Sequence, residues 1–206
     1  MFSSFADLTL WQILTRLAAF LIITSLHGYV LAALIRLSGD PTPAYSGRLT
    51  IEPFRHLASW GLVCAVLFKL GWIVPMPVDV ERLRSSRIKL ARCVLGSLLA
   101  VLALVPLFSL LRPLAVTSLS LLTAQMVLAI LDAAQDLAIW FVVLNIFPLP
   151  PLTGFLLLRA FAPTAADWLN RKPKIAEIAM VVLVVAGVVS VAIGPLNKAL
   201  RLIVIY

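Results

Sequence analysis

The sequence predicts an all-α polytopic membrane protein, with about four to six transmembrane or re-entrant helices and a short extended, β-prone segment between the first helices. Hydrophobic residues make up 62% of the 206 residues and charged residues only 13%, which is typical of a membrane protein and not of a soluble domain. The apolar residues also gather in stretches that approach the roughly 20 residues needed to span a bilayer. We expect a single membrane domain, residues 1–206, with the lipid bilayer as its solvent.

Six stretches are uncharged or nearly so, and each is a candidate span or re-entrant segment. They comprise residues 8–35, 57–74, 93–111, 114–131, 137–158 and 178–196. Residues 1–10 carry neither the basic region nor the small-residue cleavage site of a signal peptide. We therefore expect the first stretch to remain in the protein as an anchor.

The net charge of +8 indicates membrane topology and not a nucleic-acid partner, because Lys and Arg accumulate in cytoplasmic loops. If residues 57–74 dip in and return, and residues 114–158 make one net crossing, thirteen basic residues share one side and three lie opposite. We place the thirteen in the cytoplasm and the N-terminus outside. They are Arg36, Arg48, Arg55, Lys69, Arg82, Arg84, Arg87, Lys89, Arg92, Arg159, Arg171, Lys172 and Lys174.

Three segments are too rich in Pro and Gly to form regular helices. Residues 39–57 are GDPTPAYSGRLTIEPFRHL, and residues 71–80 are GWIVPMPVDV. The prolines of the first segment disfavour the α region before them, and residues 49–51 form a β-prone run. Residues 145–154 are NIFPLPPLTG, whose prolines remove backbone donors, so that a helix must break there. Irregular backbone at membrane depth is tolerated where it lines a cavity, so this break is a candidate site.

These segments, taken in order, resemble the site-2 protease family of intramembrane zinc metalloproteases. Members of that family carry the motifs HExxH, GDPTxxxxGRLTxNPxxH, GWxxPVPV and NxxPxPPLDG. The resemblance covers about residues 20–160, and we expect a C-terminal helix at about residues 175–206. The resemblance implies a site-2-protease-like core in a multi-pass protein of the bacterial cytoplasmic membrane.

The residues that carry chemistry in this family are mostly replaced here. In the family, both histidines of HExxH and the aspartate of the last motif bind zinc, and the glutamate is the general base. His27 keeps the first ligand, and Gly28 stands in place of the base. Leu31 replaces the second histidine, and Thr153 replaces the aspartate. One imidazole does not hold zinc tightly, so we predict no bound metal, no cofactor and no enzymatic activity.

The remaining polar residues near the motifs have structural interpretations. The other histidine, His56, could form a substitute site with His27 and Glu52, but their separation in sequence offers no ligand geometry. We expect His27 to face the bundle interior and to hydrogen-bond to a carbonyl or a polar side chain, because an unpaired histidine in a bilayer is costly. Asn145 either satisfies backbone groups that the prolines expose or contacts an extended substrate strand. The sequence leaves both roles of Asn145 open.

Retention of the motif scaffold with loss of the chemical groups favours a catalytically inactive pseudoprotease. We hypothesise a structural or adaptor subunit that binds transmembrane helices of another integral membrane protein or complex. The groove residues expected to bind this partner are His27, Asn145, Pro148, Pro150, Pro151 and Thr153.

Two alternatives belong to other functional classes. The first is a metalloprotease or hydrolase with rearranged zinc ligands. The second is a small transporter or proton-conducting subunit, which would use Asp132 and Asp136. The favoured interpretation of these two carboxylates is a position at the membrane surface, where they are solvated or cap a helix that begins near Leu137.

Overall fold

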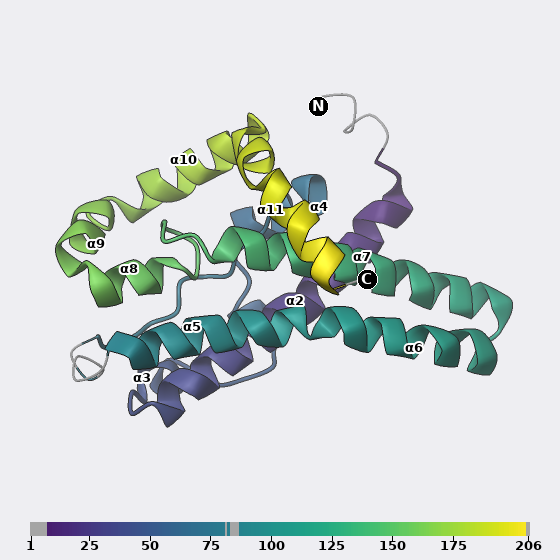
Figure 1. Cartoon of the computed structure of the whole chain (residues 1–206), viewed down its shortest axis with the longest axis horizontal. Helices are drawn as coiled ribbons and strands as arrows, with labels where there is room; N and C mark the ends of the chain where they lie inside the picture. Colours follow the sequence, from purple (N-terminus) through teal and green to yellow (C-terminus); the bar gives the residue numbers. More distant parts are fainter. Residues whose placement is uncertain (1–7, 81, 83–86, 205–206) are drawn as a thin grey trace.

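The computed structural model describes residues 8–80, 82 and 87–204, and within them the fold is all-helical (Figure 1). Three helical segments are long and apolar enough to cross a membrane. The first is helix α2 (Leu10–Leu37), and the second is formed by α5 (Arg87–Leu102) and α6 (Leu104–Ser118), which follow each other directly. The third is α7 (Leu121–Asn145). The predicted all-α polytopic class is confirmed.

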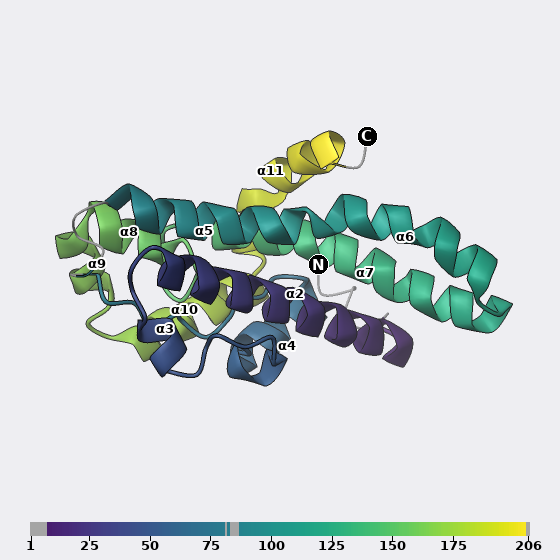
Figure 2. The same ribbon diagram turned by 90° about the horizontal axis from the view of Figure 1, so that it is seen from below.

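Helix α2 is the central element of the bundle. Its first turn is held by a capping box, in which the Thr9 hydroxyl accepts from the Gln12 backbone N–H and the Gln12 side chain accepts from Thr9 N–H. Such a box satisfies backbone donors that a helix start leaves free. The helix packs against α5 and α7, and Figure 2 shows it lying beside them along the long axis. Residues in the middle of α2, including His27, are therefore buried.

The segment that follows α2, residues 38–58, contains only short helices and no strand. One short helix, α3 (Thr42–Tyr45), forms in the segment for which we predicted none. It forms because the Asp40 carboxylate accepts hydrogen bonds from Thr42 N–H and its hydroxyl, which fixes the first turn. The β-prone run at residues 49–51 is not a strand. In the described residues, strand pairing is reduced to one antiparallel bridge between Leu57 and Ile73.

Helix α4 (Ser59–Phe68) follows a short 3-10 turn, η1 (Pro53–Arg55), and has only 10 residues. It ends at Lys69, which adopts the left-handed conformation at φ 66°. Residues 70–79 then form no helix, and Ile73 makes the bridge to Leu57. A helix of this length is too short to span a bilayer, in agreement with the prediction that residues 57–74 do not cross.

The predicted boundaries of the stretches at residues 114–131 and 137–158 are wrong. Helix α6 continues to Ser118, a short connection follows, and α7 (Leu121–Asn145) then runs without interruption from the first predicted stretch into the second. Ser120 starts α7 by accepting a hydrogen bond from Thr123 N–H. Asp132 and Asp136 consequently lie inside α7 and do not cap a helix near Leu137. Their ion pairs with basic residues of neighbouring elements allow this position.

Helix α7 ends at Asn145 and the chain enters the Pro-rich loop, as predicted from the prolines. Helices α8 (Phe155–Phe161) and α9 (Pro163–Leu169) are short. The C-terminal region is two helices and not the single helix predicted at residues 175–206. Helices α10 (Pro173–Val185) and α11 (Val188–Val204) meet at an angle of 72°, and together they could form a fourth, broken span. The backbone turns at Gly187, whose φ of 78° is accessible to glycine.

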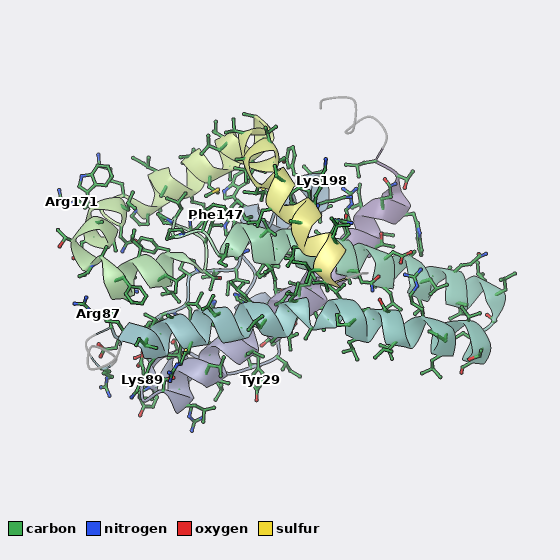
Figure 3. The ribbon with its side chains drawn as sticks, in the orientation of Figure 1. Tyr29, Arg87, Lys89, Phe147, Arg171 and Lys198 are labelled. Atoms are coloured by element: carbon green, nitrogen blue, oxygen red, sulfur yellow. The ribbon has the colours of Figure 1, made fainter. Side chains whose placement is uncertain are left out.

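Two segments whose basic residues were predicted to be cytoplasmic, one around Arg87 and one around Arg171, lie at one end of the long axis. Figure 3 shows Arg87, Lys89 and Arg171 near the end formed by α3, α8 and α9, whereas Lys198 lies far from them. This arrangement agrees with the charge count on which the predicted topology rests. Lys69 is an exception, because it pairs with Asp136 in the middle of α7. The side of the membrane that each end faces stays a prediction.

Candidate functional site

The centre of the bundle holds a hydrogen-bonded pair of motif residues. His27 of α2 is fully buried, and its Nε2 lies 2.9 Å from the Thr153 hydroxyl oxygen, with the donor set by the imidazole tautomer. The His27 ring also meets the edge of Phe141 with ring centroids 5.0 Å apart. His27 and Thr153 are two of the residues that the sequence prediction aligned with zinc-ligand positions, and they contact each other. An intramembrane histidine is thereby paired, as its cost in lipid requires.

Asn145, the last residue of α7, connects three segments around this pair. Its amide Nδ2 donates to Gly71 C=O at 2.9 Å and to Phe141 C=O at 3.0 Å. Its Oδ1 accepts from Thr153 N–H at 3.3 Å. The side chain is fully buried and bonds to backbone groups of Gly71, Phe141 and Thr153, none of which is a carbonyl freed by a proline of the loop. We call His27, Asn145 and Thr153 the polar centre.

His56 occupies the space that a side chain at position 28 would need. A Cβ atom built on Gly28 would lie 2.1 Å from His56 Nδ1, closer than any real contact. The His56 ring is held there because its Nε2–H donates to Thr50 C=O at 2.8 Å. Sequence reasoning missed this contact, although a glycine inside a helix is a signal of close approach.

Glu52, the third residue of the substitute site considered from the sequence, does not join His27 and His56. Glu52 is exposed and pairs with Arg55, its neighbour one turn along the chain. His56 Nδ1 is buried without a hydrogen-bond partner among the described residues. Burial and the nearby Arg48 lower the pKa of His56, against the opposing effect of the hydrogen bond that His56 donates to Thr50 C=O. The imidazole is therefore neutral near pH 7.

A cavity of about 320 Å³ opens beside the polar centre. Its walls come from residues 73–76, from the Pro-rich loop and from α8 and α10. Leu31 and Thr153, at the second and third ligand positions of the family pattern, line it, as do Pro150 and Pro151. We call this the proline-lined cavity. Of the other predicted groove residues, His27 and Asn145 belong to the polar centre and do not line the cavity, and Pro148 lies in neither.

These side chains do not fit a catalytic zinc site of three protein ligands. His27 Nε2 is engaged by the Thr153 hydroxyl, and Leu31 offers a hydrocarbon side chain to the cavity. In the part of the chain that the structure describes, no group of three or more His, Cys, Asp or Glu side chains could hold a metal ion. We therefore assign no catalytic step to a metal ion at this site.

Comparison with known proteins gives one named relative. The chain is 26% identical over 164 residues to "Putative zinc metalloprotease YwhC" of Bacillus subtilis (strain 168), an alignment that covers 74% of this chain and 69% of the relative. No protein-family model and no solved structure matches the chain. The comparison supports a relationship to a zinc metalloprotease.

This comparison overturns one prediction. We expected a protein without enzymatic activity, because the zinc ligands and the glutamate are replaced. The relative is named as a zinc metalloprotease, and this name points towards an enzyme. The prediction rested only on the residues that are replaced in one zinc-ligand pattern.

Proposed function

We propose that the chain is a site-2-protease-like membrane protein that holds a segment of another integral membrane protein in the proline-lined cavity. The observation that carries this proposal is the position of the cavity. It lies between the two Pro-rich segments and against positions 31 and 153, where the family pattern places two zinc ligands. A protease-like scaffold of this kind would bind its target at that place.

The chemistry of the cavity wall supports an apolar occupant with a polar flank. Ile73, Met76 and Leu156 supply apolar surface, which suits the side chains of a membrane-spanning segment. Arg159, Lys174 and Glu177 also line the cavity and would face a polar residue at the end of that segment. Binding sites of this size class are mostly apolar with a few charged groups that fix orientation.

The cellular setting follows from the same comparison and belongs to the proposal. The membrane-spanning helices support a membrane protein, and the named relative is bacterial. We place the chain in the bacterial cytoplasmic membrane, with the basic segments on the cytoplasmic side.

Site-specific photocrosslinking in native membranes tests the proposal. The photoreactive residue p-benzoylphenylalanine is placed at Pro75 or Arg159, which line the cavity. The matched control is Leu99, which is 61% exposed on α5 and faces away from the core. We expect one discrete protein adduct from both cavity positions and none from Leu99. The same adducts from all three positions would refute the proposal.

Peptide-bond hydrolysis is a second candidate function, favoured by the name of the relative. It predicts that the purified protein contains one metal ion per chain and that the His27→Ala variant loses it. It also predicts that a membrane protein of the native membrane is shortened only when the wild-type chain is present. Metal analysis of both variants, together with mass spectrometry of membrane proteins, separates hydrolysis from binding.

A further inference from the structure

A second cavity lies away from the proline-lined cavity and has charged walls. It has a volume of about 330 Å³ and is lined by the first turns of α2, by Lys69 and by the middle of α7. Its charged groups are Arg16, Lys69, Asp132 and Asp136. We call it the ionic cavity. Apart from the transporter alternative, which would use Asp132 and Asp136, none of the functions described above uses these residues.

Positive charge exceeds negative charge around this cavity. Asp136 binds Lys69 Nζ at 2.6 Å through one oxygen and the Arg201 guanidinium of α11 through the other. Asp132 pairs with Arg112 of α6. The lining alone has two cations and two carboxylates, but with Arg112 and Arg201, which pair with these carboxylates from outside the lining, the group has four cations and a net charge of +2. Burial, and then the nearby charges of Arg16 and Arg201, lower the pKa of Lys69.

Arg16 has donors to spare for a ligand. Its Nη1 donates to Val66 C=O at 2.7 Å and more weakly to Leu67 C=O at 3.4 Å, at the end of α4. Among the described residues, Nε and Nη2 of Arg16 have no protein acceptor. A guanidinium carries five N–H donors in a planar fork that matches a phosphate group. A bound anion would stabilise this excess of positive charge and accept hydrogen bonds from the free donors.

The place of the cavity on α2 identifies the source of that anion. The cavity includes Trp11, Gln12 and Thr15, within the first two turns of α2. Trp11 is 43% exposed, and tryptophan is enriched at the level of lipid headgroups. We propose that the ionic cavity binds the phosphate of an anionic phospholipid, with Arg16 and Lys69 as its main donors. Basic pockets between membrane helices bind lipid headgroups in this way.

Lipid binding to the full-length protein in detergent tests this assignment. Phosphatidylglycerol, phosphatidylcholine and inorganic phosphate are titrated separately, with bound lipid counted by native mass spectrometry and the unfolding midpoint followed in parallel. We expect phosphatidylglycerol to bind at least tenfold more tightly than phosphatidylcholine and to raise the midpoint. Equal binding of the two lipids would overturn the proposal. An equal rise from inorganic phosphate alone would overturn the assignment to a lipid.

Variants locate the site. Arg16→Gln removes the free donors, and we expect it to weaken phosphatidylglycerol binding about tenfold. Lys69→Asn removes the second cation while keeping a residue type that tolerates the left-handed backbone, and it should have a similar effect. The control, Lys89→Gln, removes an equal charge at the opposite end of the molecule. Unchanged lipid binding in both cavity variants would contradict the proposal, and the titration of the wild-type protein remains decisive if either variant is unstable.

Discussion

The polar centre and the ionic cavity hold polar groups in a membrane protein by different means. In the polar centre, the side chains of His27, Asn145 and Thr153 are buried and hydrogen-bond to each other and to the backbone, while His27 Nδ1 has no partner among the described residues. In the ionic cavity, charged side chains remain partly exposed, with Lys69 at 39% and Asp136 at 22%. The first arrangement fixes the positions of helices and loops. The second leaves charge available for a ligand.

The largest expected effect concerns the polar centre. Asn145→Ala removes the donor to Gly71 C=O and the acceptor of Thr153 N–H, leaving buried groups unsatisfied. Each costs about 1–3 kcal/mol, so we expect a loss of about 2–4 kcal/mol in the free energy of unfolding. Equilibrium unfolding in mild detergent measures it. Asn170→Ala, at an exposed asparagine, is the control, and equal losses in the two variants would contradict the role of Asn145.

The next effect tests the contact between His56 and position 28. Gly28→Ala places a methyl group 2.1 Å from His56 Nδ1, and overpacking of this kind costs about 1–3 kcal/mol. The same substitution in a His56→Ala background should cost much less, because the ring is gone. A double-mutant cycle on unfolding free energies measures this coupling. Equal costs in both backgrounds would show that the ring does not fill this space.

A smaller effect is expected for the ion pairs of Asp136, and its dependence on salt distinguishes them from the uncharged polar groups. Asp136→Asn leaves Lys69 and Arg201 without their carboxylate. Because the pairs are partly exposed, we expect a loss of about 1–2 kcal/mol, between exposed and fully buried ion pairs. Raising the salt concentration should shrink this loss, whereas the loss in Asn145→Ala should not change. A salt-independent loss in Asp136→Asn would remove the distinction between the two regions.

The smallest effect is on the pH dependence of stability. Burial lowers the pKa of His56 below its ordinary value of 6.5, so the unfolded chain binds its proton first as the pH falls. Stability is therefore full above about pH 6.5 and declines as the pH drops towards the lowered pKa. Unfolding midpoints between pH 7.5 and pH 5 measure this decline, and His56→Gln should reduce it. An identical decline in wild type and variant would assign it to other groups.

The sequence predicted those features that local chemistry determines. The apolar stretch of α2, the break after Asn145 and the absence of helix at residues 71–79 follow from hydropathy and proline alone. The ends of α6 and α7 did not, because both flanks of the connection at residues 119–120 are equally apolar. The β-prone run at residues 49–51 lacked a partner strand, and no local signal reveals that.

Individual residues of the candidate site were predicted only where they belong to a sequence motif. The motif pattern brought His27, Asn145 and Thr153 to attention, and the structure places them together. The contact of His56 with Gly28 and the gathering of charges around Asp136 depend on how separate segments pack. Such contacts join positions far apart in the chain, so their spacing carries no periodic signal.

The central claim is that the proline-lined cavity holds a segment of another membrane protein, and blocking the cavity tests it most directly. The chain is purified from native membranes as wild type, as Leu156→Trp, which fills the cavity wall, and as Leu107→Trp, at a residue 47% exposed on α6. All three are first shown to have similar unfolding midpoints. We predict that one membrane protein copurifies with wild type and Leu107→Trp and is lost from Leu156→Trp. Equal recovery of that protein with all three chains would contradict the account.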